Sequence, residues 1–171
     1  MKQINDISFF EIDTLTLAQN LIGKWIKTNI NGQEILAQIS ETECYLGITD
    51  SACHTYKGKR TAKNEPMWNN GGTIYVYLCY GLHNMLNIVS CKEGKPEAVL
   101  IRALKEANGP GKATKFLNID KTLNGESIVN NSKISIWDDG KKYKFTKQKR
   151  VGIDFALEKD KNALLRFIIK T

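Results

Sequence analysis

A strand-like run from Ile35 to Tyr45 leads from aliphatic residues into two carboxylates. Period-two alternation predicts that one face of this strand carries the odd-numbered positions, which are Ile35, Ala37, Ile39, Glu41, Glu43 and Tyr45. A carboxylate on the same face as buried aliphatic side chains loses hydration, so it needs a basic partner or a chemical task. The run therefore predicts a sheet that carries a desolvated acidic group.

The flanking sequence predicts an α+β fold with a mainly antiparallel sheet. Asn31-Gly32 marks a tight turn between Lys24–Thr28 and Ile35–Cys44, because this dipeptide is the strongest short-range hairpin signal. Further strands are predicted at Thr73–Tyr80, Met85–Ser90, Ala98–Leu104, Lys133–Trp137 and Leu164–Ile169. Helices are predicted at Thr14–Ile22, with Asp13 as N-cap, and from Asn108-Gly-Pro-Gly-Lys112 to near Leu117. Residues 46–70 read as a long functional loop, and residues 118–132 as a polar surface excursion.

Bulk properties predict one cytoplasmic domain spanning residues 1–171, nucleoid-associated if the source is bacterial. The chain is 42% hydrophobic, and no apolar run approaches the roughly 20 residues that cross a bilayer. Residues 1–14 carry acidic groups and lack the apolar core of a signal peptide. The four cysteines, Cys44, Cys53, Cys79 and Cys91, show no C-x-x-C spacing, which argues against structural zinc and redox motifs. We expect no membrane association.

The formal net charge is +7, and the excess is clustered. Six of the ten residues from Lys141 to Arg150 are basic and none is acidic. Such a strip suits a polyanion, because phosphate contacts supply affinity without regard to sequence. A solvated edge strand that uses lysines to resist aggregation explains the strip equally well.

Several sequence blocks together resemble the alkyladenine DNA glycosylase family. They follow the family's order with nearly its spacing: Glu41-Thr-Glu-Cys-Tyr-Leu-Gly47, Cys53-His54, Gly72-Thr-Ile-Tyr-Val-Tyr77, Tyr80-Gly81, Asn87-Ile88, Arg102-Ala-Leu104, Asn108-Gly-Pro-Gly-Lys112 and Arg150-Val-Gly152. Each block alone is weak, but the ordered set is specific. The resemblance implies a curved sheet with flanking helices and a protruding β-hairpin that inserts into DNA. It also implies a monomeric, monofunctional repair enzyme that excises damaged purines from double-stranded DNA, with no cofactor, no metal and no obligate protein partner.

The resemblance assigns the chemistry to Glu43. A carboxylate there stabilises an oxocarbenium-like sugar and deprotonates the attacking water. Arg102 and the backbone carbonyl of Val151 are expected to hold that water. A buried structural ion pair between Glu43 and Arg102 is the plainer alternative. Glu41 competes on position alone, and only the family match selects Glu43.

The resemblance also implies a pocket for the extruded base, formed by Tyr45, His54 and Tyr77. Electron-rich rings on both sides of a purine favour bases that alkylation has made cationic. Asn87 matches the position that crowds the exocyclic amino group of guanine. Without the resemblance, the tyrosines read as sheet packing, His54 as a hydrogen-bonded structural residue and Asn87 as a partner of the backbone. The preferred lesion among 3-methyladenine, 7-methylguanine, hypoxanthine and ethenoadenine stays open.

Extruding a nucleotide costs a few kcal/mol, and a side chain must fill the gap in the stack. The resemblance gives this wedge role to Tyr80, with Leu82 and His83 beside it. A Tyr80 that packs on the core is the alternative. The expected contacts to the DNA backbone are Lys57, Lys59, Arg60, Thr61 and Lys149.

The chain departs from the family pattern at two places. Thr61-Ala-Lys-Asn64 stands where Thr-Pro-Arg-Asn is common, so Ala62 and Lys63 replace a rigid proline and a bidentate donor. His83 stands where an aromatic ring is often found. We expect weaker or more salt-sensitive DNA binding and a softer wedge.

Two other functions remain open from the sequence. One is a non-catalytic nucleic-acid-binding protein of the same fold, which the presence of Glu43 and Arg102 disfavours. The other is a zinc enzyme that uses Cys53, His54 and another cysteine at poor ligand spacing. The resemblance provides no pocket lysine, so we expect no Schiff-base strand nicking.

Overall fold

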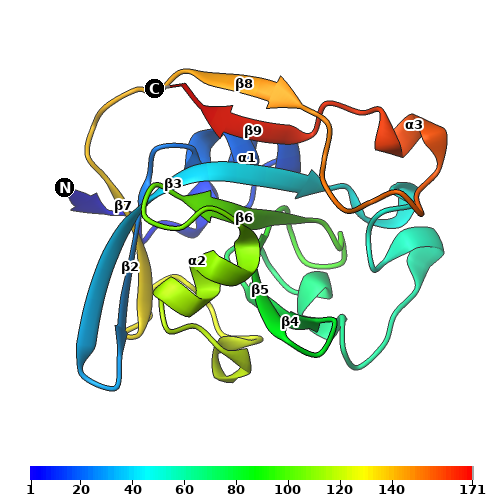
Figure 1. Cartoon of the computed structure of the whole chain (residues 1–171). Helices are drawn as coiled ribbons and strands as arrows, with labels where there is room; N and C mark the ends of the chain where they lie inside the picture. Colours follow the sequence, from blue (N-terminus) through cyan, green and yellow to red (C-terminus); the bar gives the residue numbers. More distant parts are fainter. Residues whose placement is uncertain (171) are drawn as a thin grey trace.

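The computed structural model describes residues 1–170, and over this range the strands form one curved, antiparallel sheet (Figure 1). Its order is β1-β7-β2-β3-β6-β5-β4, and β9 pairs with both β3 and β8. The strands are β1 (Lys2–Gln3), β2 (Trp25–Ile30), β3 (Gln33–Tyr45), β4 (Ile74–Cys79), β5 (His83–Val89), β6 (Ala98–Leu104), β7 (Ile134–Asp138), β8 (Phe145–Gln148) and β9 (Arg166–Ile169). The helices are α1 (Thr14–Leu21), α2 (Pro110–Phe116) and α3 (Glu158–Lys161). The α+β class is confirmed.

Strand β3 joins the two halves of the sheet. Its first half pairs with β2, and its second half lies between β6 and β9. Asn31 and Gly32 connect β2 to β3 with φ angles of 54° and 78°, as a type I′ turn requires at both central residues. The predicted hairpin is therefore confirmed, and its local turn signal fixes the register of the long strand.

A β-bulge or similar irregularity in β3 changes which face meets the core. The pairing of β3 with β6 shifts register on either side of Glu41. Ile39 and Cys44 both pack in the main hydrophobic core, although a regular strand would place them on opposite faces. The prediction that all six odd positions share one face is therefore wrong. Beyond the irregularity, Glu43 and Tyr45 face away from the core that holds Ile39.

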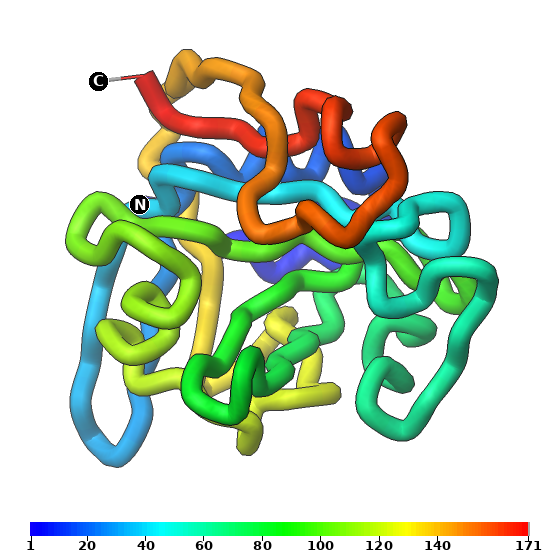
Figure 2. The backbone as a smooth tube through the Cα atoms, turned by 45° about the vertical axis from the view of Figure 1, so that its right-hand side comes forward, coloured from blue at the N-terminus to red at the C-terminus, as the bar shows by residue number. Residues whose placement is uncertain are grey.

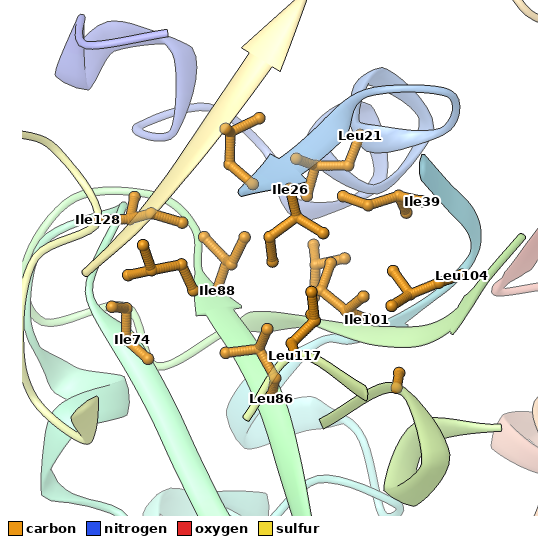
Figure 3. Packing of buried hydrophobic residues seen from close by; sticks show 14 of the residues in the cluster. Leu21, Ile26, Ile39, Ile74, Leu86, Ile88, Ile101, Leu104, Leu117 and Ile128 are labelled. Atoms are coloured by element: carbon orange, nitrogen blue, oxygen red, sulfur yellow. The ribbon is translucent and has the colours of Figure 1, made fainter. Parts of the chain in front are cut away.

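Strand β6 shows the same change. Ile101 and Leu104 both lie in the main core, although strict alternation along this strand would place them on opposite faces and Arg102 on the face of Leu104. Figure 3 shows Ile39, Ile101 and Leu104 close to one another in this core. The irregularities in β3 and β6 thus place Glu43 and Arg102 together on the sheet face opposite the main core.

The remaining core draws on helix α1 and on segments without regular structure. Asp13 accepts a hydrogen bond from the Thr16 amide at 2.9 Å, which confirms the predicted N-cap. Residues 118–132 were expected to be a polar surface excursion, and this is wrong in part. They bury Ile119, Leu123 and Ile128, which are at most 3% exposed.

Within residues 1–170, no helix has the length and apolar character that a membrane crossing requires.

The loop and the basic strip match their predictions in outline. Residues 46–70 contain only short 3-10 turns, at Gly47–Thr49, Tyr56–Gly58 and Glu65–Trp68.

Part of the basic strip forms β8, whose one partner in the described chain is β9. Phe145 of β8 packs edge to face on Phe167, with ring centroids 5.5 Å apart. Strand β8 is therefore an edge strand that carries the exposed Lys147 and is flanked by the exposed Lys144 and Lys149, which is compatible with either role considered for the strip.

The β4–β5 hairpin ends in a tight turn at Tyr80 and Gly81. Their φ angles are 51° and 66°, and the Leu82 amide donates to the Cys79 carbonyl at 3.1 Å. Tyr80 thus lies in the turn, and the strand predicted to reach Tyr80 ends one residue earlier, at Cys79. Its side chain is 91% exposed and that of Leu82 is 77% exposed. A packed position for Tyr80 on the core is excluded.

Helix α2 braces this turn from one side. Thr114 Oγ1 donates to the Asn84 carbonyl at 2.7 Å. The His83 ring lies against the first turn of α2, where a Cβ added to Gly111 would come within 2.9 Å of His83 Cγ. Glycine at this position therefore allows the helix to approach the hairpin closely.

Replacing Gly111 with alanine tests this contact. Alanine favours a helix over glycine by up to about 1 kcal/mol, but the clash with His83 costs about 1–3 kcal/mol. We expect Gly111→Ala to lower the free energy of unfolding by roughly 1 kcal/mol in urea titrations. In a His83→Ala background the same change should be neutral or stabilising. Equal effects in both backgrounds would show that the two residues do not touch.

Candidate active site

A cavity of about 250 Å³ opens between the β4–β5 hairpin and residues 152–155. Figure 2 shows the segment around residue 152 (orange) passing above the hairpin (green). The cavity brings together the four predicted pocket residues, which are Tyr45, His54, Tyr77 and Asn87. It is smaller than the roughly 300–1,000 Å³ of pockets for drug-sized ligands, so its scale suits one small planar group.

One wall of the cavity is an aromatic cluster from β4 and the loop before it. His54 and Tyr77 meet edge to face, with ring centroids 4.5 Å apart and planes at 72°. His54 Nδ1 lies 2.8 Å from the Tyr75 hydroxyl, and Tyr75 is almost fully buried. Tyr75 thus fixes the orientation of His54, a role that the sequence did not assign. The signal was present, because Tyr75 and Tyr77 alternate along one strand.

The imidazole of His54 is held neutral. Partial burial lowers the pKa of His54, and the positive charges of Lys63 and Lys59 lower it further. A neutral ring next to Tyr77 adds no charge to the cavity at pH 7. The ring is therefore suited to hydrogen bonding or packing rather than to donating a proton as a cation.

Asn87 lies at the floor of the cavity on β5. Its Nδ2 donates to the carbonyls of Tyr75 and Met85, each at 3.3 Å, and the residue is 4% exposed. The backbone contact considered from the sequence is therefore present. Because the same side chain lines the cavity, it is also held rigidly where it can restrict a ligand.

Glu43 is the buried carboxylate next to this cavity, with a side chain that is 1% exposed. Its Oε1 accepts from the Val151 amide and its Oε2 from the Tyr45 hydroxyl, each at 2.9 Å. Glu43 does not line the cavity itself. Tyr45, which does, links the cavity wall to the carboxylate.

Burial is the main influence on Glu43 and raises its pKa. The Val151 amide, the Arg102 charge and the Tyr45 hydroxyl oppose this effect, while the charge of Glu41 adds to it. On balance the protein disfavours the ionised form of Glu43, although three neighbours favour it. The contact from Val151 comes from its amide, and the role predicted for its carbonyl stays a prediction.

Arg102 lies between the two carboxylates. Its Nε is 3.1 Å from Glu41 Oε1 and 3.3 Å from Glu43 Oε1. This buried Nε forms no hydrogen bond within the described chain, so both contacts are ionic. Arg166 Nη1 also binds Glu41 Oε1, at 2.8 Å. Glu41 is therefore held by two guanidinium groups and Glu43 by one, which separates two residues that the sequence left equivalent in position.

A buried ion pair between Arg150 and Asp50 supports the site, and the sequence did not identify it. Arg150 donates to both oxygens of Asp50, at 2.6 and 2.9 Å, and to the Cys44 carbonyl at 2.9 Å. Its guanidinium lies 4.9 Å from the centroid of the Tyr45 ring. Arg150 was counted in the basic strip, but its side chain is fully buried. The Arg150-Val-Gly152 block was the signal that could have distinguished it.

The residues expected to contact a DNA backbone lie outside the cavity and are exposed. Lys57, Lys59, Arg60 and Thr61 lie on the loop, and Lys149 lies at the end of β8. Arg60 is not free, because it pairs with Glu65 and its guanidinium lies 4.8 Å from the Trp68 ring centroid. These positions are accessible to a large anion, and their role stays a prediction.

The zinc alternative finds no support in the geometry. Across residues 1–170, no group of three or more His, Cys, Asp and Glu side chains is placed to hold a metal ion. The Cys53 thiol lies 3.3 Å from Thr55 Oγ1, and burial raises its pKa. Cys53 is therefore a structural thiol beside the cavity.

The burial of Glu43 predicts a pH-dependent stability difference. Its folded-state pKa lies above the unfolded value of about 4.3, so protonation favours the folded state. The free energy of unfolding of wild type minus that of Glu43→Gln should be greatest at a pH below the unfolded-state pKa. This difference should fall as the pH rises through the raised folded-state pKa. We expect the variant to be at least as stable as wild type at pH 7. Urea titrations from pH 4 to 8 measure this, and a difference that does not vary with pH would contradict it.

The chain matches a protein family over most of its length. A family model described as methylpurine-DNA glycosylase (MPG) matches residues 8–171. A protein of Borrelia garinii subsp. bavariensis named "Putative 3-methyladenine DNA glycosylase" is 43% identical, covering 96% of this chain and 95% of that protein. A protein of the same name from Natranaerobius thermophilus is 40% identical, covering 96% and 94%. The chain therefore belongs to the methylpurine-DNA glycosylase family.

Proposed function

We propose that this DNA glycosylase, which acts on alkylated purines in base excision repair, extrudes the damaged nucleotide into the cavity beside Tyr45. A water molecule activated by Glu43 then hydrolyses the N-glycosidic bond and leaves an abasic site. The observation that carries the proposal is the union of a base-sized aromatic cavity with a buried carboxylate, joined by the hydrogen bond from Tyr45 to Glu43. The relatives named as 3-methyladenine DNA glycosylases support the same chemistry.

The surroundings of Glu43 suit a base that acts on water. Each carboxylate oxygen has about two lone pairs, and the described chain supplies one hydrogen bond to each. A water molecule can therefore be accepted without breaking an existing contact. As the glycosidic bond lengthens, the sugar gains positive charge, which an ionised Glu43 stabilises before it takes the proton of the water. Arg102 keeps Glu43 ionised while this happens.

The aromatic wall suits recognition of a purine. The rings of Tyr77 and Tyr45 line the cavity together with the side chain of Asn87. A base that carries positive charge is attracted to such rings. A normal guanine would place its exocyclic amino group against the rigid side chain of Asn87. Selection then depends on fit and on charge together.

The reaction ends with base release. No lysine lines the cavity in the described residues, and Lys63, whose Nζ lies 5.8 Å from the centroid of the Tyr77 ring, is exposed outside the lining, so no amine is placed in the cavity to form a Schiff base with the sugar. We therefore propose a monofunctional enzyme that does not cut the strand. A non-catalytic role for the same fold is less consistent with the site, because a protein that only binds gains nothing from a desolvated Glu43.

Replacing Glu43 tests the chemistry. With duplex DNA carrying single defined lesions, we expect metal-independent base release by wild type. Loss of a general base costs about 10²–10⁴-fold, so Glu43→Gln should lower single-turnover release by at least about a hundredfold while DNA binding is retained. The matched control is Glu41→Gln, which also removes a carboxylate contact to Arg102 and should lower release by less than about tenfold.

Three outcomes would change the assignment. Equal release by wild type and Glu43→Gln removes Glu43 from its role. A larger loss in Glu41→Gln transfers the role to Glu41. Binding without release by wild type, on every lesion tried, favours the non-catalytic alternative.

Replacing Tyr80 tests the wedge. Its exposed ring is proposed to fill the space left by the extruded nucleotide. Stacking of an aromatic ring on a base contributes about 1–3 kcal/mol, so Tyr80→Ala should lower excision of neutral lesions by roughly 5- to 100-fold. Tyr80→Phe keeps the ring and should retain most of the activity. Fluorescence of ethenoadenine in duplex DNA reports the extruded state, and unchanged extrusion in Tyr80→Ala would argue against a wedge.

A further inference from the structure

The cavity has an exposed aromatic residue on each side of its mouth, and only one of them has a role so far. Tyr80 is 91% exposed on the hairpin, and Phe155 is 75% exposed on the opposite segment. Both line the cavity. We propose that Phe155 packs against the nucleotide that neighbours the extruded one in the same DNA strand. This inference rests on the proposed function and adds a second contact to the DNA.

The outward position of Phe155 is enforced by its neighbours. Ile153 and Ala156 are buried and form a small cluster with Ala52. The Ala156 amide donates to the Ile153 carbonyl at 2.9 Å, and the Leu157 amide donates to Ser51 Oγ at 2.8 Å. Because residues on both sides of Phe155 are anchored inward, its ring cannot turn into the core without breaking these contacts.

The location of the ring distinguishes it from other exposed apolar residues. Scattered surface leucines and valines are normal and need no partner. Leu157 is also exposed, at 51%, but it does not line the cavity. Any DNA strand that delivers a base into the cavity must cross its mouth, where Tyr80 already stands on one side. The strand therefore passes the ring of Phe155 on the other side.

The charges around Phe155 favour an apolar contact over a phosphate contact. Lys147 and Lys149 are exposed on and after β8, where they can meet the DNA backbone. Close to Phe155 in the sequence, however, Asp154 and Glu158 are exposed and acidic, and Glu158 is paired with Lys161 at 2.6 Å. A phosphate directly over Phe155 would come near the carboxylate of the adjacent Asp154, whereas the uncharged face of a base or a sugar would meet no such repulsion. The ring is thus suited to stacking, which tolerates every sequence because each base has a π face.

The test uses a duplex with one tetrahydrofuran residue, a stable abasic analogue that carries no base to be extruded. Stacking of this kind is worth about 5- to 100-fold in affinity, and we expect Phe155→Ala to weaken binding by that factor. The salt dependence of binding should not change, because no phosphate contact is lost. Phe155→Trp keeps a ring and should bind within about threefold of wild type.

Leu157→Ala is the matched control, because it removes an exposed apolar side chain from the same segment but not from the cavity mouth. It should bind like wild type. The melting temperature of Phe155→Ala should also match wild type, since the ring makes little contact in the free protein.

Several results would overturn the inference. They are unchanged binding of Phe155→Ala to the tetrahydrofuran duplex, an equal loss in Leu157→Ala, or a loss confined to duplexes that retain a base. The proposed function is judged separately by base release from wild type. If wild type binds the abasic duplex but releases no base from lesion duplexes, the catalytic proposal is wrong. The contribution of Phe155 to binding of the abasic duplex can still be measured in that case.

Discussion

The buried pair of Arg150 and Asp50 is the interaction on which the site depends. It ties the segment that carries Val151 to the loop that follows β3, and its guanidinium also lies over the Tyr45 ring. Removing one partner of such a pair leaves an uncompensated buried charge, which typically costs about 3–5 kcal/mol. The hydrogen bonds that hold Glu43 come from Val151 and Tyr45, so the geometry of the carboxylate follows from an ion pair that does not line the cavity.

Burying the carboxylate of Glu43 at the candidate site lowers the stability of the folded protein. One guanidinium, one amide and one hydroxyl favour the ionised form of this buried carboxylate, but the cost of its desolvation outweighs them and raises its pKa. The irregular pairing of β3 and β6 makes this arrangement possible, because it directs Glu43 and Arg102 to the face opposite the main core. A regular pair of strands would also have placed Glu43 and Arg102 on one face, but that face would have been the one that carries Ile39 and Leu104 into the main core.

Local signals in the sequence predicted the elements, whereas the site needed the resemblance and the structure. Asn31-Gly32 specified the β2–β3 hairpin and Asp13 capped α1, because each acts through its own backbone. The change of face at Glu41 was not predictable, since period-two alternation assumes a strand without a bulge. Arg150 was misread for a related reason: a charge count cannot separate one buried guanidinium from the exposed lysines around it. The resemblance placed Tyr45, His54, Tyr77 and Asn87 together, and their convergence on one cavity is consistent with it.

The turn at Tyr80 has a consequence for how fast a lesion can be found. A bulky residue at φ 51° occupies a sparsely populated backbone conformation, yet the following glycine and the bracing by α2 hold it there in the free protein. The tip therefore needs no ordering when it meets a duplex. In the wedge role proposed for Tyr80, such a tip would leave the search limited by the breathing of base pairs and not by rearrangement of the protein, so weakly paired positions would be sampled first.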